Sequence, residues 1–377
     1  VEGEGDTYDY ELGLKKITQE DQSASFRFQK GALNVEALYD QTPHNWSNQT
    51  ETLYRETSPG VFELPDGLQG TVQNASDWLS VMQSTFIGLA HTEKLGTRQD
   101  KTGVNLGYAF SNALSLNFAF SQEKKTGHKA QAAPMGFNYA NEIAKSVDQM
   151  VYESMANLNY KVDKMALGLT YGLSLFQNDI NTLIWDNTKR ETDQYVNTTG
   201  YLAGDQSSRG RLATAPDNMA QVLGLTTVFD LPASNKLNAD FSYTLMTQDD
   251  ELLPSTINSA ITSGSVNMSD PASLPSKTAD ATQTLVVQNY SINNDAIKNI
   301  ALGIRVRSEQ LGNSSKEIHF SSGYVRVDQA LEPSVETARL AYKKLILGAN
   351  ADWSITPALT FGVDIAQETA DRTHREY

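Results

Sequence analysis

The chain has 377 residues, a formal net charge of −15 and no cysteine. The acidic balance argues against nucleic acid as a partner, because phosphate recognition needs a basic surface. The lack of cysteine excludes disulfides, thiolate metal sites and haem attachment through a C-x-x-C-H motif in this chain. No run of about 18 consecutive apolar residues occurs, so the sequence contains no candidate transmembrane helix.

The clearest structural signal is a two-residue periodicity, which residues 165–175 display best. This segment reads M-A-L-G-L-T-Y-G-L-S-L, with large apolar side chains alternating with Ala, Gly, Thr or Ser. Because a strand alternates its side chains between two faces, one face is apolar and the other is small and polar. The pattern recurs in residues 104–110, 114–120, 223–229, 237–245, 300–306 and 359–365. Its recurrence at this length predicts a transmembrane β-barrel.

Taken in chain order, the period-two segments predict about thirteen strands. We place these strands at residues 7–16, 22–30, 32–40, 102–110, 113–122, 150–161, 165–176, 218–230, 236–247, 282–292, 296–307, 338–353 and 358–367.

The connections between these strands alternate between short turns and long polar loops from Gly31 onward. The short turns lie at 30–31, 111–112, 162–164, 232–235, 293–295 and 356–357, and the long loops at 41–101, 123–149, 177–217, 248–281 and 308–337. This alternation predicts an antiparallel up-and-down barrel whose short turns all lie at one end. Bacterial outer-membrane barrels have this asymmetry, with short periplasmic turns and long extracellular loops. We therefore expect an all-β protein of the bacterial outer membrane, with lipid against its outer face.

Neither end of the chain resembles the end of a complete barrel. Residues 1–5 are acidic and lack the apolar core of a signal peptide, and the last residues, T-H-R-E-Y, do not finish on an alternating strand. We expect one β-barrel domain over residues 1–377, forming an incomplete barrel within a longer protein.

Aromatic residues recur where predicted strands descend to a short turn: Phe110, Tyr160, Phe229, Tyr290 and Trp353. Aromatics at one height are what an interfacial girdle requires, since the ring lies in the boundary and its polar edge in water. The alternative is that β-propensity alone enriches Tyr and Phe in strands. Their repeated position beside the turns favours the girdle.

One segment, residues 77–90, departs from the strand pattern. Asp77 can N-cap a helix that ends near Ala90. Its apolar stripe would comprise Trp78, Val81, Met82, Thr85, Phe86 and Leu89. Such a helix in a long extracellular loop would either fold inward as a constriction or cap the mouth, or it would pack on neighbouring loops.

The sequence offers no catalytic signature, and we expect no enzyme. It has no nucleophile elbow, phosphate-binding loop or H-E-x-x-H motif. The five histidines are scattered, and we expect each to be a solvated loop or rim residue. The acidic run at 248–251 would suit a surface divalent cation through its oxygen ligands, with a solvated acidic loop as the alternative.

The predicted inward faces are mostly small and weakly charged. Candidate lumen-lining residues are Asn105, Asn117, Gly168, Thr170, Gly172, Ser174, Asn238 and Asp240. A narrow diffusion porin usually sets its selectivity with rings of charge. Small neutral walls instead suit a wide lumen or one filled by another protein, although glycine and serine also ease strand curvature.

Several segments resemble the MtrB/PioB family, the outer-membrane barrels of porin–cytochrome electron conduits. The matching segments are G-V-F-E-L-P (60–65), L-G-T-R-Q-D (95–100), F-S-Q-E-K-K-T-G (120–127), S-L-F-Q-N-D-I-N-T-L-I-W-D-N (174–187), A-P-D-N (215–218) and Y-V-R-V-D (324–328). They span most of the chain in the family's order. Family members are longer, and many carry an N-terminal cysteine pair that this chain lacks.

The resemblance implies a sheath for electron transfer. A periplasmic multihaem c-type cytochrome would insert into the barrel, and an extracellular multihaem cytochrome would dock on the long loops. Haem c would be carried by those partners, and this chain would bind no cofactor. The alternatives are a general or substrate-selective diffusion porin or transporter, and an outer-membrane enzyme or adhesin that acts through its loops.

Overall fold

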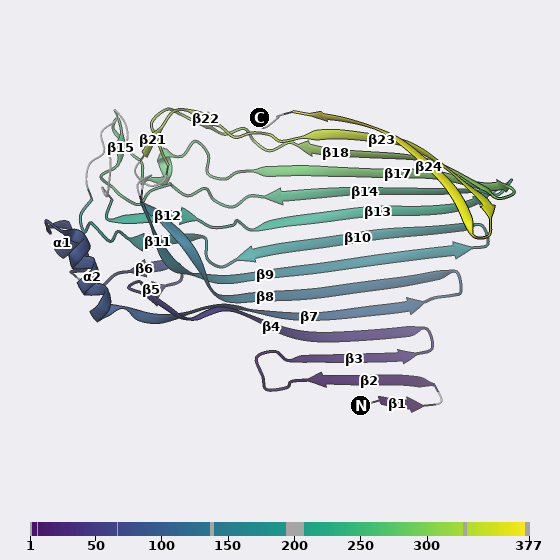
Figure 1. Cartoon of the computed structure of the whole chain (residues 1–377), viewed down its shortest axis with the longest axis horizontal. Helices are drawn as coiled ribbons and strands as arrows, with labels where there is room; N and C mark the ends of the chain where they lie inside the picture. The colour runs from purple at the N-terminus through teal and green to yellow at the C-terminus, as the bar shows by residue number, and fades with distance from the viewer. Residues whose placement is uncertain are drawn as a thin grey trace.

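The fold is dominated by one antiparallel sheet of 14 strands (Figure 1). The computed structural model describes residues 2–5, 7–65, 67–135, 139–193, 207–326 and 330–373. In spatial order the main sheet comprises β1 (Glu2–Gly5), β2 (Tyr8–Lys15), β3 (Ser23–Lys30), β4 (Leu33–Thr52), β7 (His91–Ala109), β8 (Leu114–Met135), β9 (Tyr139–Val162), β10 (Met165–Asn178), β13 (Asn218–Leu231), β14 (Asn235–Gln248), β17 (Ala281–Ile297), β18 (Ile300–Asn313), β23 (Tyr342–Thr356) and β24 (Leu359–Arg372).

Shorter elements occupy the long connections. They are β5 (Arg55–Ser58), β6 (Val61–Glu63), α1 (Leu68–Gln73), α2 (Trp78–Leu89), β11 (Thr182–Asp186), β12 (Arg209–Ala213), β15 (Thr262–Ser263), β16 (Val266–Asn267), the 3₁₀ turn Pro271–Ser273, β19 (His319–Phe320), β20 (Tyr324–Arg326), β21 (Ala330–Glu332) and β22 (Val335–Glu336). Among the residues that the structure describes, no helix is both long and apolar enough to cross a membrane.

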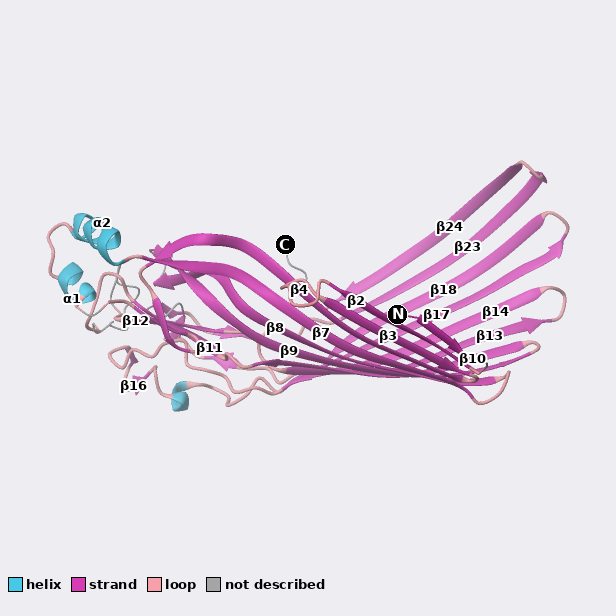
Figure 2. Cartoon of the chain, turned by 90° about the horizontal axis from the view of Figure 1, so that it is seen from below, coloured by secondary structure: helices cyan, strands magenta, loops and turns pink. Residues whose placement is uncertain are grey.

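The two-residue periodicity predicted from the sequence is the organising feature of the sheet. In the register, Leu169 of β10 lies opposite Leu158 of β9 and Leu225 of β13, so their side chains share one face. The neighbouring Gly168 lies opposite Asn159 and Thr226 on the other face. Figure 2 shows the sheet bent into an open trough. The small polar side chains lie on its concave face, where Gly172 and Ser174 line a depression. The convex face carries the apolar stripes.

All thirteen predicted strands coincide with strands of the main sheet, and β1 adds a fourteenth. The up-and-down order of neighbours is confirmed, because each strand from β1 to β24 pairs with the next main-sheet strand in the chain. Within the described residues, β1 does not pair with β24, so the sheet has two open edges.

The predicted boundaries of the long loops were wrong for the first two. Strands β4 and β7 reach far into 41–101, and β8 and β9, of 22 and 24 residues, occupy most of 123–149. A membrane-crossing strand needs only about 9–11 residues, so these strands project well beyond a bilayer. The projecting parts contact water, which removes the apolar alternation and makes them resemble loops in the sequence.

One predicted turn was displaced. The turn expected at 293–295 lies instead at Lys298 and Asn299, because β17 continues to Ile297. Asn299 adopts a left-handed conformation with φ of 65°, which asparagine tolerates better than most residues. The polar run at 293–295 suggested a reversal, but these residues pair within the sheet as far as Asn294.

The long connections also build a folded unit, which we call the cap. It comprises α1, α2 and the small sheet β12-β11-β6-β5, and it lies at the end of the trough opposite the short turns (Figure 1). Its core is a cluster of buried apolar side chains: Leu53, Tyr54, Phe62, Leu64, Leu68, Val72, Ala133, Met135, Ile143, Ile180, Leu183 and Trp185. The loops were expected to be polar, but residues from four regions of the chain share one hydrophobic core.

Gly60 allows two distant segments of the cap to meet. It has φ of +80°, and a Cβ there would lie 2.3 Å from the backbone oxygen of Thr182. The amide of Ile184 donates to the Gly60 carbonyl at 2.8 Å. A residue with a side chain would therefore force β6 away from β11.

The division of the sheet into two faces predicts unequal costs for substitutions at adjacent residues. Leu169→Arg and Leu225→Arg should each destabilise the protein by about 2–4 kcal/mol, because each puts a charge against lipid. Gly168→Ser should cost much less, since its added Cβ meets Asn159 Oδ1 at 3.4 Å, an ordinary contact. Denaturant unfolding of the complete protein in lipid vesicles measures the difference. Equal penalties on both faces would mean that the sheet is not a membrane wall.

Candidate functional site

The concave wall of the trough is the candidate functional surface. The register places all eight predicted lumen residues on this face, from Asn105 on β7 to Asp240 on β14. Two of them hydrogen-bond across strands: Thr170 Oγ1 donates to Asn157 Oδ1 at 2.8 Å, and Asn238 Nδ2 donates to Ser291 Oγ at 3.1 Å. Uncharged polar groups therefore make up most of the middle of the wall, and Asp240 is the one charged residue among the eight.

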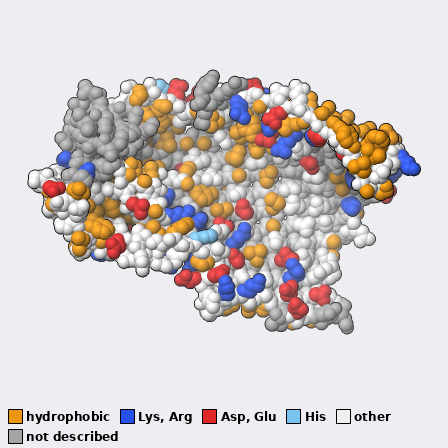
Figure 3. All heavy atoms as spheres, in the orientation of Figure 1, with side chains coloured by type: hydrophobic (Ala, Val, Ile, Leu, Met, Phe, Trp, Pro, Cys, Tyr) orange, Lys and Arg blue, Asp and Glu red, His pale blue; other side chains and the backbone are white. Residues whose placement is uncertain are grey.

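Charged side chains gather toward the two margins of the wall. Figure 3 looks onto the concave face and shows mostly uncharged side chains over the middle strands, with acidic and basic ones toward both margins. These marginal charges pair with each other: Arg305 with Asp364 at 2.6 Å, Arg307 with Glu309 at 3.1 Å, Lys344 with Glu368 at 2.9 Å, and Arg27 with Glu36 at 2.9 Å. This division was not predicted from the sequence, because three of the four pairs join different strands, whose order the sequence alone does not give.

The Arg305–Asp364 pair spans a whole intervening strand. Both guanidinium Nη atoms donate to the Asp364 carboxylate at 2.6 Å, a bidentate arrangement. Gly348 of β23 lies directly opposite Arg305 in the register, and a Cβ there would be 2.8 Å from Arg305 Nε. The glycine therefore leaves the space through which the arginine reaches β24.

The aromatic residues predicted to form a girdle lie near the short-turn end of the sheet. Phe110, Tyr160, Tyr290 and Trp353 are all exposed, and Phe229 is partly buried. Exposed aromatic rings on the convex face suit the boundary between hydrocarbon and water.

The helix considered at 77–90 corresponds to α2, and Asp77 accepts a hydrogen bond from the Ser80 amide as its N-cap. Val81 and Met82 pack against the core of the cap. Phe86 and Leu89, expected on the same buried stripe, are exposed instead. Figures 1 and 2 place α2 at the outer end of the cap, so it packs on loops and does not constrict the trough.

A buried polar network holds the cap together. Asp186, at the end of β11, accepts hydrogen bonds from the Leu64 amide and from Arg209 Nε, each at 2.9 Å. Arg209 also donates to Glu63 at 2.6 Å. Tyr54 Oη donates to the Asp186 carbonyl at 2.7 Å. Each half-buried charge thus has a partner, as burial requires.

Two histidines were misjudged as simple solvated residues. His128 of β8 lies between two carboxylates, with Nε2 at 3.5 Å from Glu56 and Nδ1 at 3.9 Å from Glu93. His91 Nε2 lies 3.9 Å from the other oxygen of Glu93. Glu56 belongs to β5 of the cap, whereas His128, Glu93 and His91 belong to β8 and β7. Their contacts therefore join the cap to the extended strands. Only the three-dimensional pairing of distant segments could have identified it.

The protonation of this cluster follows from its contacts. The hydrogen bond to Glu56 raises the pKa of His128, against the opposing effect of burial. Burial tends to raise the pKa of Glu56, but hydrogen bonds from His128, Ser146 and the Gly60 amide together lower it. Both shifts favour the charged pair, so the junction is strongest where the histidine is protonated and the glutamate is not.

The acidic run at 248–251 makes two contacts within the chain. The Asp250 carboxylate accepts the backbone amide of Asp217 at 2.6 Å, and Glu251 forms an isolated β-bridge with Thr278. Across the described part of the chain, no three His, Asp or Glu side chains gather into a group suited to a metal ion. His374 lies outside the described residues.

Taken together, a two-faced antiparallel sheet with short turns at one end and a folded cap at the other defines the wall of an outer-membrane β-barrel. The family model for the outer membrane beta-barrel porins MtrB/PioB matches residues 1–377. The chain therefore belongs to the MtrB/PioB family, and it resides in the bacterial outer membrane. By the asymmetry of such barrels, the short turns are periplasmic and the cap is extracellular.

The chain is similar to the outer membrane protein MtrB of Shewanella baltica (strain OS185), with 27% identity over 226 residues. That match covers 60% of this chain and 30% of the relative, so the chain spans less than a third of the relative's length in the match.

Solved structures of outer-membrane proteins are also similar over most of the chain. OmpT of Vibrio cholerae has a TM-score of 0.31 and 9% identity, covering 97% of this chain and 98% of that one. The ferric-catecholate import receptor Fiu of E. coli K12 has a TM-score of 0.37 and 11% identity, covering 98% and 61%. The toluene transporter TodX of Pseudomonas putida has a TM-score of 0.29 and 10% identity, covering 97% and 86%.

The junction between cap and strands should depend on pH. The raised pKa of His128 contributes stability that is complete below about pH 6.5 and is lost as pH rises through the folded-state pKa. The lowered pKa of Glu56 contributes stability above about pH 4.5, lost as pH falls through its folded-state pKa. Hydrogen exchange of residues 55–63 should therefore be slowest between about pH 4.5 and 6.5, after correction for the intrinsic rate.

In wild type, hydrogen exchange of residues 55–63 should become faster as pH rises and His128 loses its proton. His128→Gln should abolish this pH dependence, because glutamine does not titrate. His44→Gln is the matched control, because His44 is exposed and forms no ion pair with the described residues. The same pH profile in wild type and His128→Gln would contradict this role for His128.

Proposed function

We propose that the protein is the barrel sheath of a transmembrane electron conduit. A periplasmic multihaem c-type cytochrome occupies the lumen, and an extracellular multihaem cytochrome docks on the cap. The observation that carries this proposal is the concave wall of a member of the MtrB/PioB family, whose middle is lined mostly by small, uncharged side chains. Such a wall lets a protein surface approach closely, whereas rings of charge would serve a solute-selective pore.

The physical need for a sheath comes from the bilayer. A haem protein cannot cross hydrocarbon unprotected, since burying its unpaired polar and charged groups in lipid is costly. The convex face meets lipid through residues such as Leu169, Tyr171 and Leu223, all exposed in this structure. The concave face offers hydroxyls and amides to the protein that it encloses. A single sheet thus contacts lipid on one face and the enclosed cytochrome on the other.

The redox chemistry belongs to the partners in this proposal. Haem c is carried by the cytochromes, and this chain, which has no cysteine, supplies neither haem attachment nor a haem ligand. We infer a structural role and no catalytic one. The MtrB name of the Shewanella relative supports this proposal, as does the family to which both proteins belong.

The cap supports the second docking step. The hydrophobic core of the cap gives the long connections a fixed shape. At the outer end of the cap, α2 carries three exposed apolar side chains, Leu79, Ile87 and Leu89. A rigid surface loses little conformational entropy on binding. A folded extracellular platform therefore suits protein docking better than mobile loops would.

A diffusion porin or transporter is the second candidate. The paired charges at the margins of the wall favour it, because ion pairs on a lumen surface suit contact with water. The two candidates differ in what fills the lumen, so they predict opposite conductances.

The sheath predicts that the complete protein copurifies with a haem-stained partner and conducts ions poorly in planar bilayers. Gly168→Trp combined with Thr170→Trp adds bulk to the concave wall and should displace the partner, raising conductance and abolishing electron transfer across vesicles. Leu167→Trp combined with Leu169→Trp is the matched control, because the same rings then face lipid on the same strand.

Under the sheath proposal the control variant should keep its partner and its low conductance. A porin would instead show high conductance without a haem partner, and the inward tryptophans would lower that conductance. That second pattern would refute the sheath.

A further inference from the structure

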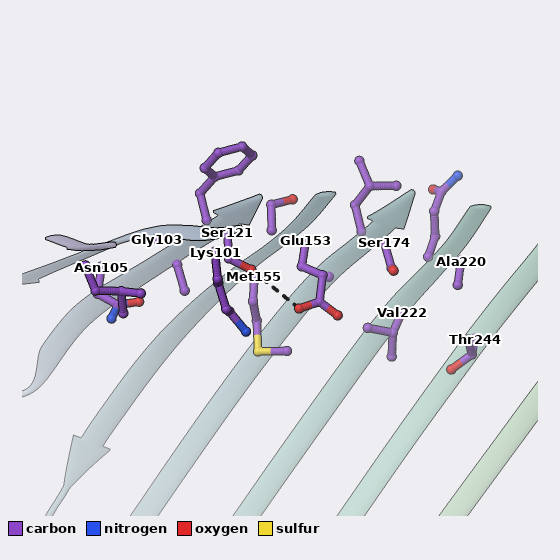
Figure 4. A pocket seen from close by; sticks show the side chains of 17 residues that line it. Lys101, Gly103, Asn105, Ser121, Glu153, Met155, Ser174, Ala220, Val222 and Thr244 are labelled. Carbon is purple, nitrogen blue, oxygen red and sulfur yellow. Dashed lines mark hydrogen bonds between the residues drawn. The ribbon is translucent and has the colours of Figure 1, made fainter. Parts of the chain in front are cut away.

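A shallow depression lies in the middle of the concave wall. It has a volume of about 450 Å³ and spans strands from β4 to β14 (Figure 4). Most of its lining is uncharged, including Asn105, Met155, Ser174, Val222 and Thr244. Two charged side chains, Lys101 and Glu153, also line it.

Among the described residues, neither of these two charges lies within ion-pair distance of a partner, unlike the paired charges at the margins. Lys101 nevertheless lies directly opposite Asp40 of β4 and Glu123 of β8 in the register. Glu153 instead lies opposite the uncharged Ser121 and Ser174. Glu153 of β9 accepts only a long hydrogen bond from Ser121 Oγ, at 3.5 Å, drawn as a dashed line in Figure 4. Neither Glu153 nor Lys101 forms a salt bridge with any residue that the structure describes. Lys101 lies on β7 and Glu153 on β9, with β8 between them.

The two kinds of surface would respond differently to a protein placed against them. Covering the marginal ion pairs would remove water from charges that already satisfy each other, which costs free energy and gains no new pairing. Covering the middle would desolvate few charges. It would also let Glu153, which has no basic residue opposite it on the described neighbouring strands, gain a partner of opposite sign, and complementary charges fix the register of an interface.

We propose that this depression is the seat of the protein that occupies the lumen. Its occupant presents a compact, largely uncharged surface with a basic side chain opposite Glu153. The marginal strands β18, β23 and β24 face water instead. This inference rests on the proposed sheath function and adds to it the wall against which the partner lies.

Site-specific photo-crosslinking in the complete complex tests the position of the seat. A photoreactive residue at Ser174, in the depression, should crosslink to the haem-stained partner. The same residue at Ala366 of β24, on the same face but at the margin, should not. Equal crosslinking from both positions, or crosslinking from Ala366 alone, would overturn the proposed seat and leave the sheath function intact.

A pair of charge-removing substitutions tests the complementarity. Glu153→Gln should weaken retention of the partner about tenfold in a salt wash, the change expected when one close charge pair is lost. Glu368→Gln, which removes a carboxylate already paired with Lys344 at the margin, should leave retention unchanged. Equal retention in the two variants would overturn the role of Glu153. Absence of any haem partner from the wild-type complex would overturn the sheath function and the seat together.

Discussion

The rest of this structure depends on one constraint, which is that backbone N–H and C=O groups cannot remain unpaired in hydrocarbon. A β-sheet satisfies this by pairing each strand with two neighbours. Twelve of the 14 strands of the main sheet, from β2 to β23, have both neighbours among the described residues. The outermost strands, β1 and β24, each have one. Because the same pairing fixes the side chains alternately on two faces, it also separates the lipid surface from the lumen surface. The contrast between Leu169 and Gly168, adjacent in sequence, follows directly from it.

This constraint also explains what could be predicted from the sequence. Where lipid lies on one side and the lumen on the other, the residues alternate, and strands such as β10 and β13 are visible in the sequence. Beyond the bilayer, both sides of β8 and β9 contact water or the cap, so the alternation ends although the strands continue. The turn at Asn299 was displaced for a related reason, since a polar residue such as Asn293 suits a lumen face as well as a turn. Asn294, on the other face, instead donates to the carbonyl of Ala233 in the neighbouring turn.

Contacts between segments far apart in the sequence could not be predicted from residue patterns. The cap depends on pairs such as Leu64 with Asp186 and Trp185 with Met135, which are joined only by the fold. The Glu56–His128 pair likewise joins a cap strand to an extended barrel strand. The lumen residues could be placed on one face by counting alternate positions. Their division into an uncharged middle and paired charges at the margins required the order of the strands.

In residues 165–175, odd positions face lipid, and under the sheath proposal even positions face a lumen that another protein fills. Nitroxide labels at successive positions of this segment, in the complete protein in vesicles, test the claim most directly. Labels at odd positions should be relaxed by oxygen dissolved in lipid. Labels at even positions should be relaxed by a water-soluble nickel chelate only after the partner is removed. Accessibility without a two-residue period, or even positions equally open to the chelate with and without the partner, would contradict the account.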